Sequence, residues 1–254
     1  MEEICPAKDD AATLAALGVL AYLLADGIHE ALGHGGACLL GGRHVQLLSS
    51  AYFHSTPGSA WTDVGGPLAN LGTALLFGLA LRRRIASPEM RLFLRLALAF
   101  NLFWASGQMI YSAVSLKDDW AFAIAGLEPQ WLWRAGLGAV GVFFYEWGIS
   151  ALARGLAADG AAGPTRTRRL LIPYVAAGLA ACAAALFFRP DRHGALHEAI
   201  LETFGANLGL LLALRSRAPA TAPFTAIARR RGWVLAASLA LLIFAATLGR
   251  GLVF

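Results

Sequence analysis

Long apolar segments separated by short arginine-rich ones constrain the fold of this chain most strongly. An apolar run of about 20 residues is long enough to cross the hydrocarbon core of a bilayer as a helix. Charged residues are only 15% of the chain, against about a quarter in soluble proteins. We therefore expect an all-α, polytopic transmembrane helix bundle of about six to seven spans. The expected spans are residues 11–41, 64–82, 92–116, 130–154, 169–188, 195–214 and 232–250.

The arginines predict how these spans are oriented. They gather between the second and third, the fourth and fifth, and the sixth and seventh spans, and such loops face the cytoplasm. The N-terminus is then cytoplasmic and the C-terminus lies outside, in a protein integral to a bacterial inner (plasma) membrane. Because loop arginines explain the net charge of +5, we expect no nucleic-acid partner.

The first span is longer than a bilayer requires, so it must tilt, break or end in a cavity. A polar stretch rich in glycine and serine follows it and reaches to the start of the second span. Within this stretch, residues 45–53 could form a short hairpin. The fold prediction is therefore a helix bundle with a short polar loop or hairpin after the first span.

The first span carries four ionisable residues within nine positions: Asp26, His29, Glu30 and His34. Ionisable groups inside a membrane helix are costly unless they are paired or face water, so they are functional candidates. The order His-Glu followed by a second His is similar to the zinc-peptidase signature His-Glu-x-x-His, in which two imidazoles bind zinc and the Glu activates water.

The spacing departs from that signature, because His29 and His34 are five residues apart. An ideal α-helix rotates such a pair by about 140°, whereas a π-bulge brings residues i and i+5 together. One interpretation therefore has both histidines as ligands and Glu30 as the base. The alternative has Glu30 and His34, four apart, as ligands, with Asp26 one turn earlier on the same face. We prefer the first.

The start of the second span adds Gly66, Pro67 and Asn70. With the His-Glu motif about 30 residues earlier, residues 20–125 resemble the site-2 protease family of intramembrane zinc metallopeptidases. The resemblance implies that Asn70 helps to hold the substrate carbonyl or the oxyanion. It also implies a third metal ligand, an Asp in a third core helix.

That family usually has Asp before Gly at the third ligand, and the corresponding region here has no Asp-Gly. The best substitute is the pair Asp118 and Asp119 at the end of the third span, with Asp119 slightly favoured. The arginine pattern alone places this pair, the His-Glu motif and the Gly-Pro element at the outer ends of their spans. All three elements therefore fall at one membrane depth, which favours one shared site.

A second polar group opens the sixth span, also at its outer end. His193 and His197 are four residues apart, as are Glu198 and Glu202. They could supply a further metal ligand, a second metal or a proton relay. Alternatively, they form an ordinary interfacial helix start, where acidic groups favour the N-terminal dipole.

We expect a single transmembrane domain, with a metal-site core over residues 11–125 and additional transmembrane helices over residues 126–254. The expected function is an intramembrane zinc metallopeptidase that binds one Zn²⁺ and hydrolyses peptide bonds of membrane-embedded proteins or peptides. One rival is a membrane enzyme that uses iron or zinc on a lipid and recruits His193 and His197. The other is a metal or proton transporter, or a non-catalytic binding protein.

Overall fold

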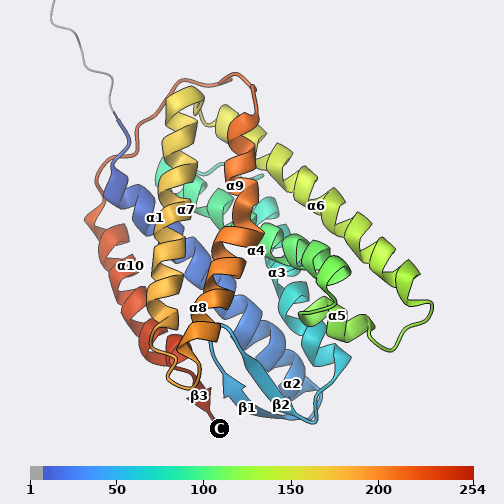
Figure 1. Ribbon diagram of the computed structural model, residues 1–254. Helices are drawn as coiled ribbons and strands as arrows, with labels where there is room; N and C mark the ends of the chain where they lie inside the picture. Colours follow the sequence, from blue (N-terminus) through green and yellow to red (C-terminus); the bar gives the residue numbers. More distant parts are fainter. Residues whose placement is uncertain (1–7) are drawn as a thin grey trace, which may run out of the picture.

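The computed structural model describes residues 8–254 and is mostly helical (Figure 1). Five helices in this part of the chain are long and apolar enough to cross a membrane, which confirms a polytopic helix bundle. The five helices are Ala11–Leu40, Pro88–Ser115, Gln130–Ala158, Gly163–Ala185 and Arg231–Gly249. The first of these helices comprises α1 (Ala11–Gly27), the π-helix η1 (Ile28–Gly35) and α2 (Gly36–Leu40). The next three are α4, α6 and α7. The last comprises α10 (Arg231–Phe244) and η5 (Ala245–Gly249).

The other two expected spans differ from these five. The second span is the helix α3 (Ala60–Ala80), which has 21 residues but is not among the five. Residues 195–214, which we expected to form one span, are not one regular helix. That segment breaks into α8 (Arg192–Ile200), the π-turn η2 (Leu201–Gly205), η3 (Ala206–Leu208), α9 (Gly209–Leu212) and η4 (Ala213–Arg215).

The break follows from the residues at its centre. Asn207 leaves helical geometry, with φ −94° and ψ 16°. Backbone groups freed inside an apolar bundle must find other partners, and neighbouring side chains supply them. The Tyr145 hydroxyl accepts from Gly209 N at 2.7 Å and donates to Ala206 O at 2.9 Å, while Asn207 Nδ2 donates to Glu202 O at 2.8 Å. The irregular segment is therefore held by specific contacts.

The two ends of the bundle differ in their contacts. At one end, the arginine-rich connections bind each other through buried or half-buried polar pairs. Arg169 contacts the buried Asp9 carboxylate twice, at 2.9 and 3.0 Å, and Arg95 Nε donates to Asp159 at 2.6 Å. The strands lie at the opposite end (Figure 1).

A small antiparallel sheet closes the end opposite the arginines. It has the order β2-β1-β3, with β1 (His44–Leu48), β2 (Phe53–Thr56) and β3 (Leu252–Val253). β1 and β2 form the expected hairpin, although it extends three residues further at its C-terminal end than residues 45–53. The C-terminal strand β3 pairs with β1 through Leu48 and Leu252, so the chain end holds the hairpin in place.

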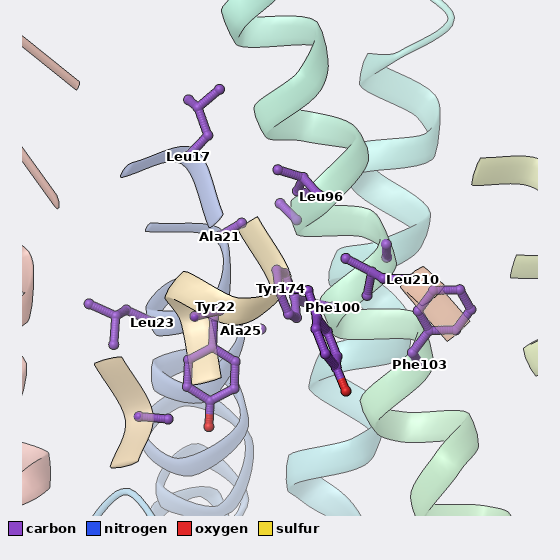
Figure 2. Close-up of a cluster of buried hydrophobic side chains, with 14 of the residues drawn as sticks. Leu17, Ala21, Tyr22, Leu23, Ala25, Leu96, Phe100, Phe103, Tyr174 and Leu210 are labelled. Atoms are coloured by element: carbon purple, nitrogen blue, oxygen red, sulfur yellow. The ribbon is translucent and has the colours of Figure 1, made fainter. Parts of the chain in front are cut away.

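The core lies where α1, α4 (Pro88–Ser115) and α7 (Gly163–Ala185) pack together. Figure 2 shows Tyr22, Phe100 and Tyr174 meeting there from these three helices. Tyr22 stacks on Trp104 with ring centroids 5.6 Å apart and meets the edge of Phe100 at 5.8 Å. By contrast, α6 (Gln130–Ala158) and α10 are mostly exposed on their apolar faces, as helices that face lipid must be.

Candidate metal centre

The π-helix η1 brings His29 and His34 onto one face, as the five-residue spacing predicts. Residues Ile28–Gly35 are wound as a π-helix, which pairs residue i with residue i+5. The two imidazole rings lie with their centroids 4.7 Å apart and nearly perpendicular, and their Nε2 atoms are 3.1 Å apart. The prediction of a local widening is therefore confirmed, and both histidines offer Nε2 to one point.

Hydrogen bonds fix which nitrogen of each ring carries the proton. His29 Nδ1 lies 2.6 Å from Asn70 Oδ1, and His34 Nδ1 lies 2.8 Å from the carbonyl oxygen of Thr62. Because a carbonyl oxygen can only accept, each Nδ1 must be the donor. Both Nε2 atoms then hold free lone pairs, the form in which histidine binds a metal.

The side-chain amide of Asn70 has a fixed orientation, because its nitrogen also forms hydrogen bonds. Asn70 Nδ2 donates to Ala25 O at 3.0 Å and to Asn101 Oδ1 at 2.8 Å, and the side chain is fully buried. Its Oδ1 therefore faces His29. The structure places Asn70 behind this imidazole, where it orients the ring. The role at the substrate carbonyl or oxyanion that the resemblance implies stays a prediction.

With zinc as the probe metal, replacing Asn70 with Ala is expected to weaken metal binding about 10- to 100-fold, the usual cost of losing a partner that orients a metal ligand. The loss arises because His29 can then rotate or change tautomer. A competition titration with a chromophoric chelator measures this affinity. Asn207→Ala is the matched control, since Asn207 is equally buried but contacts Glu202 O. Equal zinc affinity in the Asn70 variant and the wild type would contradict the assignment.

Asp119, the residue favoured from the sequence, completes the group that could hold a metal ion. It opens the short helix α5 (Asp119–Ile124), and its Oδ2 lies 3.1 Å from His29 Nε2 and 3.3 Å from His34 Nε2. Asp118 caps this helix with its side chain, which accepts from Asp119 N at 2.9 Å. Gln108 Nε2 donates to both carboxylates, at 3.0 Å to Asp118 and 2.9 Å to Asp119. These contacts fix the carboxylate that faces the histidines.

The surroundings shift the pKa values of the two neighbouring carboxyls in opposite directions. Burial by itself raises the pKa of Asp119, but His34 and His29 hold that pKa well below its usual range. For Asp118, burial and then the Asp119 charge raise the pKa to about 7. Without a metal, protonated histidines supply the positive charge that keeps Asp119 ionised. A bound cation would supply that charge in their place, and a metal-binding carboxylate must be deprotonated.

The three ligand atoms have the separations that a bound metal requires. Zinc–ligand distances of about 2.0–2.1 Å give neighbouring ligands about 3.3 Å apart in a tetrahedron, against 3.1, 3.1 and 3.3 Å in this protein. The residues therefore fit one metal ion, and two imidazoles with one carboxylate suit zinc or iron(II).

Glycine is required where α3 passes this site. A Cβ atom at Gly66 would lie 2.5 Å from His34 Nε2 and 2.7 Å from His29 Nε2, against the two metal-binding nitrogens. A Cβ at Gly33 would meet Gly66 Cα at 2.5 Å, so η1 and α3 are in backbone contact here. The Gly-Gly-Pro sequence of α3 thus serves to bring its backbone up to the metal centre.

Gly66→Ala is accordingly expected to abolish zinc binding, because the new methyl group forces the two Nε2 atoms apart. Zinc content per chain, measured by mass spectrometry after purification, should fall from about one to near zero. Gly72→Ala on the same helix provides the control, because among the described residues no atom lies within 4 Å of a Cβ there. Full zinc content in the Gly66 variant would show that the histidines converge elsewhere.

Glu30 and Asp26 are buried next to the metal ligands but are not part of the ligand group. Glu30 follows His29 and interacts electrostatically with His34, His29 and Asp119. Its Oε2 has no hydrogen-bond partner among residues 8–254. Asp26 Oδ2 accepts from the Tyr22 hydroxyl at 3.4 Å. The alternative ligand set of Asp26, Glu30 and His34 is therefore not the one that the structure brings together.

The polar residues of the sixth expected span also lie outside the ligand group. His197 has a side chain that is 67% exposed and lies 3.5 Å from Glu198, and His193 is exposed at the start of α8. A further metal ligand or a second metal at these histidines finds no support in the described part of the chain. Glu198 and Glu202 instead line a cavity beside the metal centre.

Three residues of the site carried no recognisable signal in the sequence. Thr62 acts through its backbone carbonyl, so its side chain gives no indication. Trp104 stacks on His29 with ring centroids 4.9 Å apart, and Gln108 binds the carboxylates. Nothing in the sequence paired any of the three with these partners.

Comparisons of the chain with protein-family models, curated proteins and solved structures find no match.

Proposed function

We propose that the protein is an intramembrane zinc metallopeptidase that hydrolyses peptide bonds of membrane-embedded proteins or peptides. The observation that carries the proposal is the convergence of His29 Nε2, His34 Nε2 and Asp119 Oδ2 within 3.3 Å of one another, with the unpaired Glu30 carboxyl beside them. The resemblance of the motifs over residues 20–125 to the site-2 protease family supports the same function.

Each residue has a role in this proposal. His29, His34 and Asp119 hold the metal, and Asn70 and Thr62 orient the two imidazoles. Zinc bound there would polarise the substrate carbonyl and lower the pKa of a water molecule. Glu30 would accept a proton from the attacking water as the water oxygen bonds to the carbonyl carbon, and Glu30 would then return that proton to the amide nitrogen as the C–N bond breaks. The two products are a carboxylate and an amine.

The remaining features agree with a peptidase open to one end of the bundle. The ligand group lies beside the hairpin, where Phe53 stacks on His34 with ring centroids 5.4 Å apart. The far end carries the buried Asp9–Arg169 pair, and no further group of metal ligands occurs among residues 8–254. A transporter needs a polar path across both halves of the bundle, so this distribution favours chemistry at one end.

The direct test uses purified protein in lipid nanodiscs together with synthetic single-span peptides that carry Gly and Asn within the span. Mass spectrometry of the products should find cleavage inside the apolar segment. A zinc chelator should stop it and added zinc should restore it. Cleavage that survives complete removal of metal, or release of fatty acid from the nanodisc lipid in place of peptide cleavage, would overturn the proposal.

A further inference from the structure

A cavity of about 400 Å³ adjoins the metal centre, between α4, α6 and the broken segment from α8 to η3. This volume is in the range of small-molecule and side-chain binding pockets. Two residues that line it contact the metal ligands directly. Trp104 stacks on His29, and Gln108 donates to Asp119 Oδ2 at 2.9 Å. A group bound in the cavity would therefore lie next to the reacting bond.

Three buried polar atoms of the cavity wall have no partner among the described residues: the donor Trp104 Nε1 and the acceptors Gln108 Oε1 and Glu202 Oε2. The first two belong to α4. Trp104 is 0% exposed and Gln108 is 6% exposed, so both atoms carry the cost of an unmade hydrogen bond. They lie one helical turn apart on the same face of α4. A substrate main chain offers the complementary groups, a carbonyl for Trp104 and an N–H for Gln108.

The rest of the lining indicates which class of molecule fits. The walls are mainly apolar, with Ile110, Val114 and Leu201 among them, and the charged groups, Asp118, Glu198 and Glu202, are all acidic. Acidic groups disfavour the phosphate of a lipid headgroup, and they tolerate a neutral or basic peptide. An apolar pocket with a main-chain donor and acceptor therefore favours a peptide over a phospholipid.

We propose that this cavity is a specificity pocket that binds a large apolar side chain of the peptide substrate, adjacent to the bond that is cleaved. Trp104 Nε1 and Gln108 Oε1 pair with the main chain of the same substrate segment, which must be extended to reach them. This inference rests on the proposed function, because it places the substrate relative to the metal. It adds a preference for residues such as leucine over glycine at that position.

The test uses three hydroxamates that share one metal-binding group. N-acetyl-leucine hydroxamate carries an apolar side chain and a peptide group, N-acetyl-glycine hydroxamate lacks the side chain, and octanohydroxamate has an acyl chain without a peptide group. Calorimetric titration of the purified, zinc-loaded full chain should give the leucine compound about tenfold tighter binding than the glycine compound, as expected for burial of a leucine side chain.

A variant that fills the cavity distinguishes side-chain binding in the pocket from hydroxamate binding at the metal. Gly205 lines the cavity, and a Cβ there would meet only the Leu201 side chain, at 4.0 Å. Gly205→Leu should reduce the leucine preference to less than about threefold and leave binding of the glycine compound and of zinc unchanged. Gly136→Leu on α6, where no described atom lies within 4 Å of a Cβ, should keep the preference. Val114 lies at the exposed rim of the cavity. Val114→Trp should reduce the leucine preference in the same way, and this variant is measured instead if Gly205→Leu does not fold.

Equal binding of the leucine and glycine compounds by the zinc-loaded wild type would contradict the proposed specificity pocket. It would not contradict the proposed peptidase function. Tighter binding of octanohydroxamate than of the leucine compound would also overturn it, since the cavity would then hold an acyl chain. A leucine preference that persists in both cavity-filling variants would place the side chain elsewhere. A wild type that binds neither zinc nor any hydroxamate would instead overturn the proposed function.

Discussion

Glu30→Gln is expected to stop peptide-bond cleavage while one zinc ion per chain stays bound. The amide has nearly the shape of the carboxyl but cannot accept a proton from water, and loss of a general base typically costs 100- to 10,000-fold in rate. Glu30 is not in the group of metal ligands, so zinc affinity should be unchanged. The measurement is the cleavage rate of a single-span peptide, together with zinc content on the same samples.

Glu146→Gln is the matched control, because Glu146 is exposed on α6 and lies outside the site. It should cleave at the wild-type rate. Activity of the Glu30 variant within about threefold of wild type would remove Glu30 from the mechanism. Loss of zinc together with activity would instead assign Glu30 to the ligands, as in the alternative set with His34 and Asp26.

His34→Ala is expected to lose both zinc and activity. The variant removes one of the three ligand atoms and leaves only His29 and Asp119, whose Oδ2 and Nε2 lie 3.1 Å apart. Two ligands hold zinc far more weakly than three, so zinc content after dialysis should fall from about one per chain to near zero. The measurement is metal content by mass spectrometry, with the wild type purified in parallel.

His44→Ala is the control, because it removes a histidine that lies outside the ligand group. His44 is exposed in β1 and should retain full zinc content and activity. Zinc that remains at one equivalent in the His34 variant would contradict the metal centre. Zinc that is lost equally in the His44 variant would place the metal at the hairpin.

The sequence was most informative where local geometry decides the outcome. The interval between His29 and His34 predicted a π-helix because only i to i+5 pairing brings these side chains together, and η1 has that form. Asp119 was favoured because the resemblance implies an Asp in a third core helix, and the arginine pattern then placed it at the same end as the other motif elements. The first prediction rests on helical periodicity, and the second on a motif and on the order of the charged loops.

The sequence was least informative where packing between distant elements decides. Asn70 matched a motif, but its contact with His29 depends on where Ala25 and Asn101 lie. The break in the sixth span depends on Tyr145 from another helix, which binds the freed backbone groups. The cavity lined by Trp104 and Gln108 exists only because that broken segment packs against α4 and α6. Hydropathy cannot reveal such contacts.

The most direct test of the metal centre is X-ray absorption at the zinc edge on the purified wild-type chain. The arrangement of His29, His34 and Asp119 predicts one zinc per chain with two imidazole nitrogens and at least one oxygen at about 2.0–2.1 Å. A zinc shell without imidazole, or iron in place of zinc, would contradict the zinc peptidase.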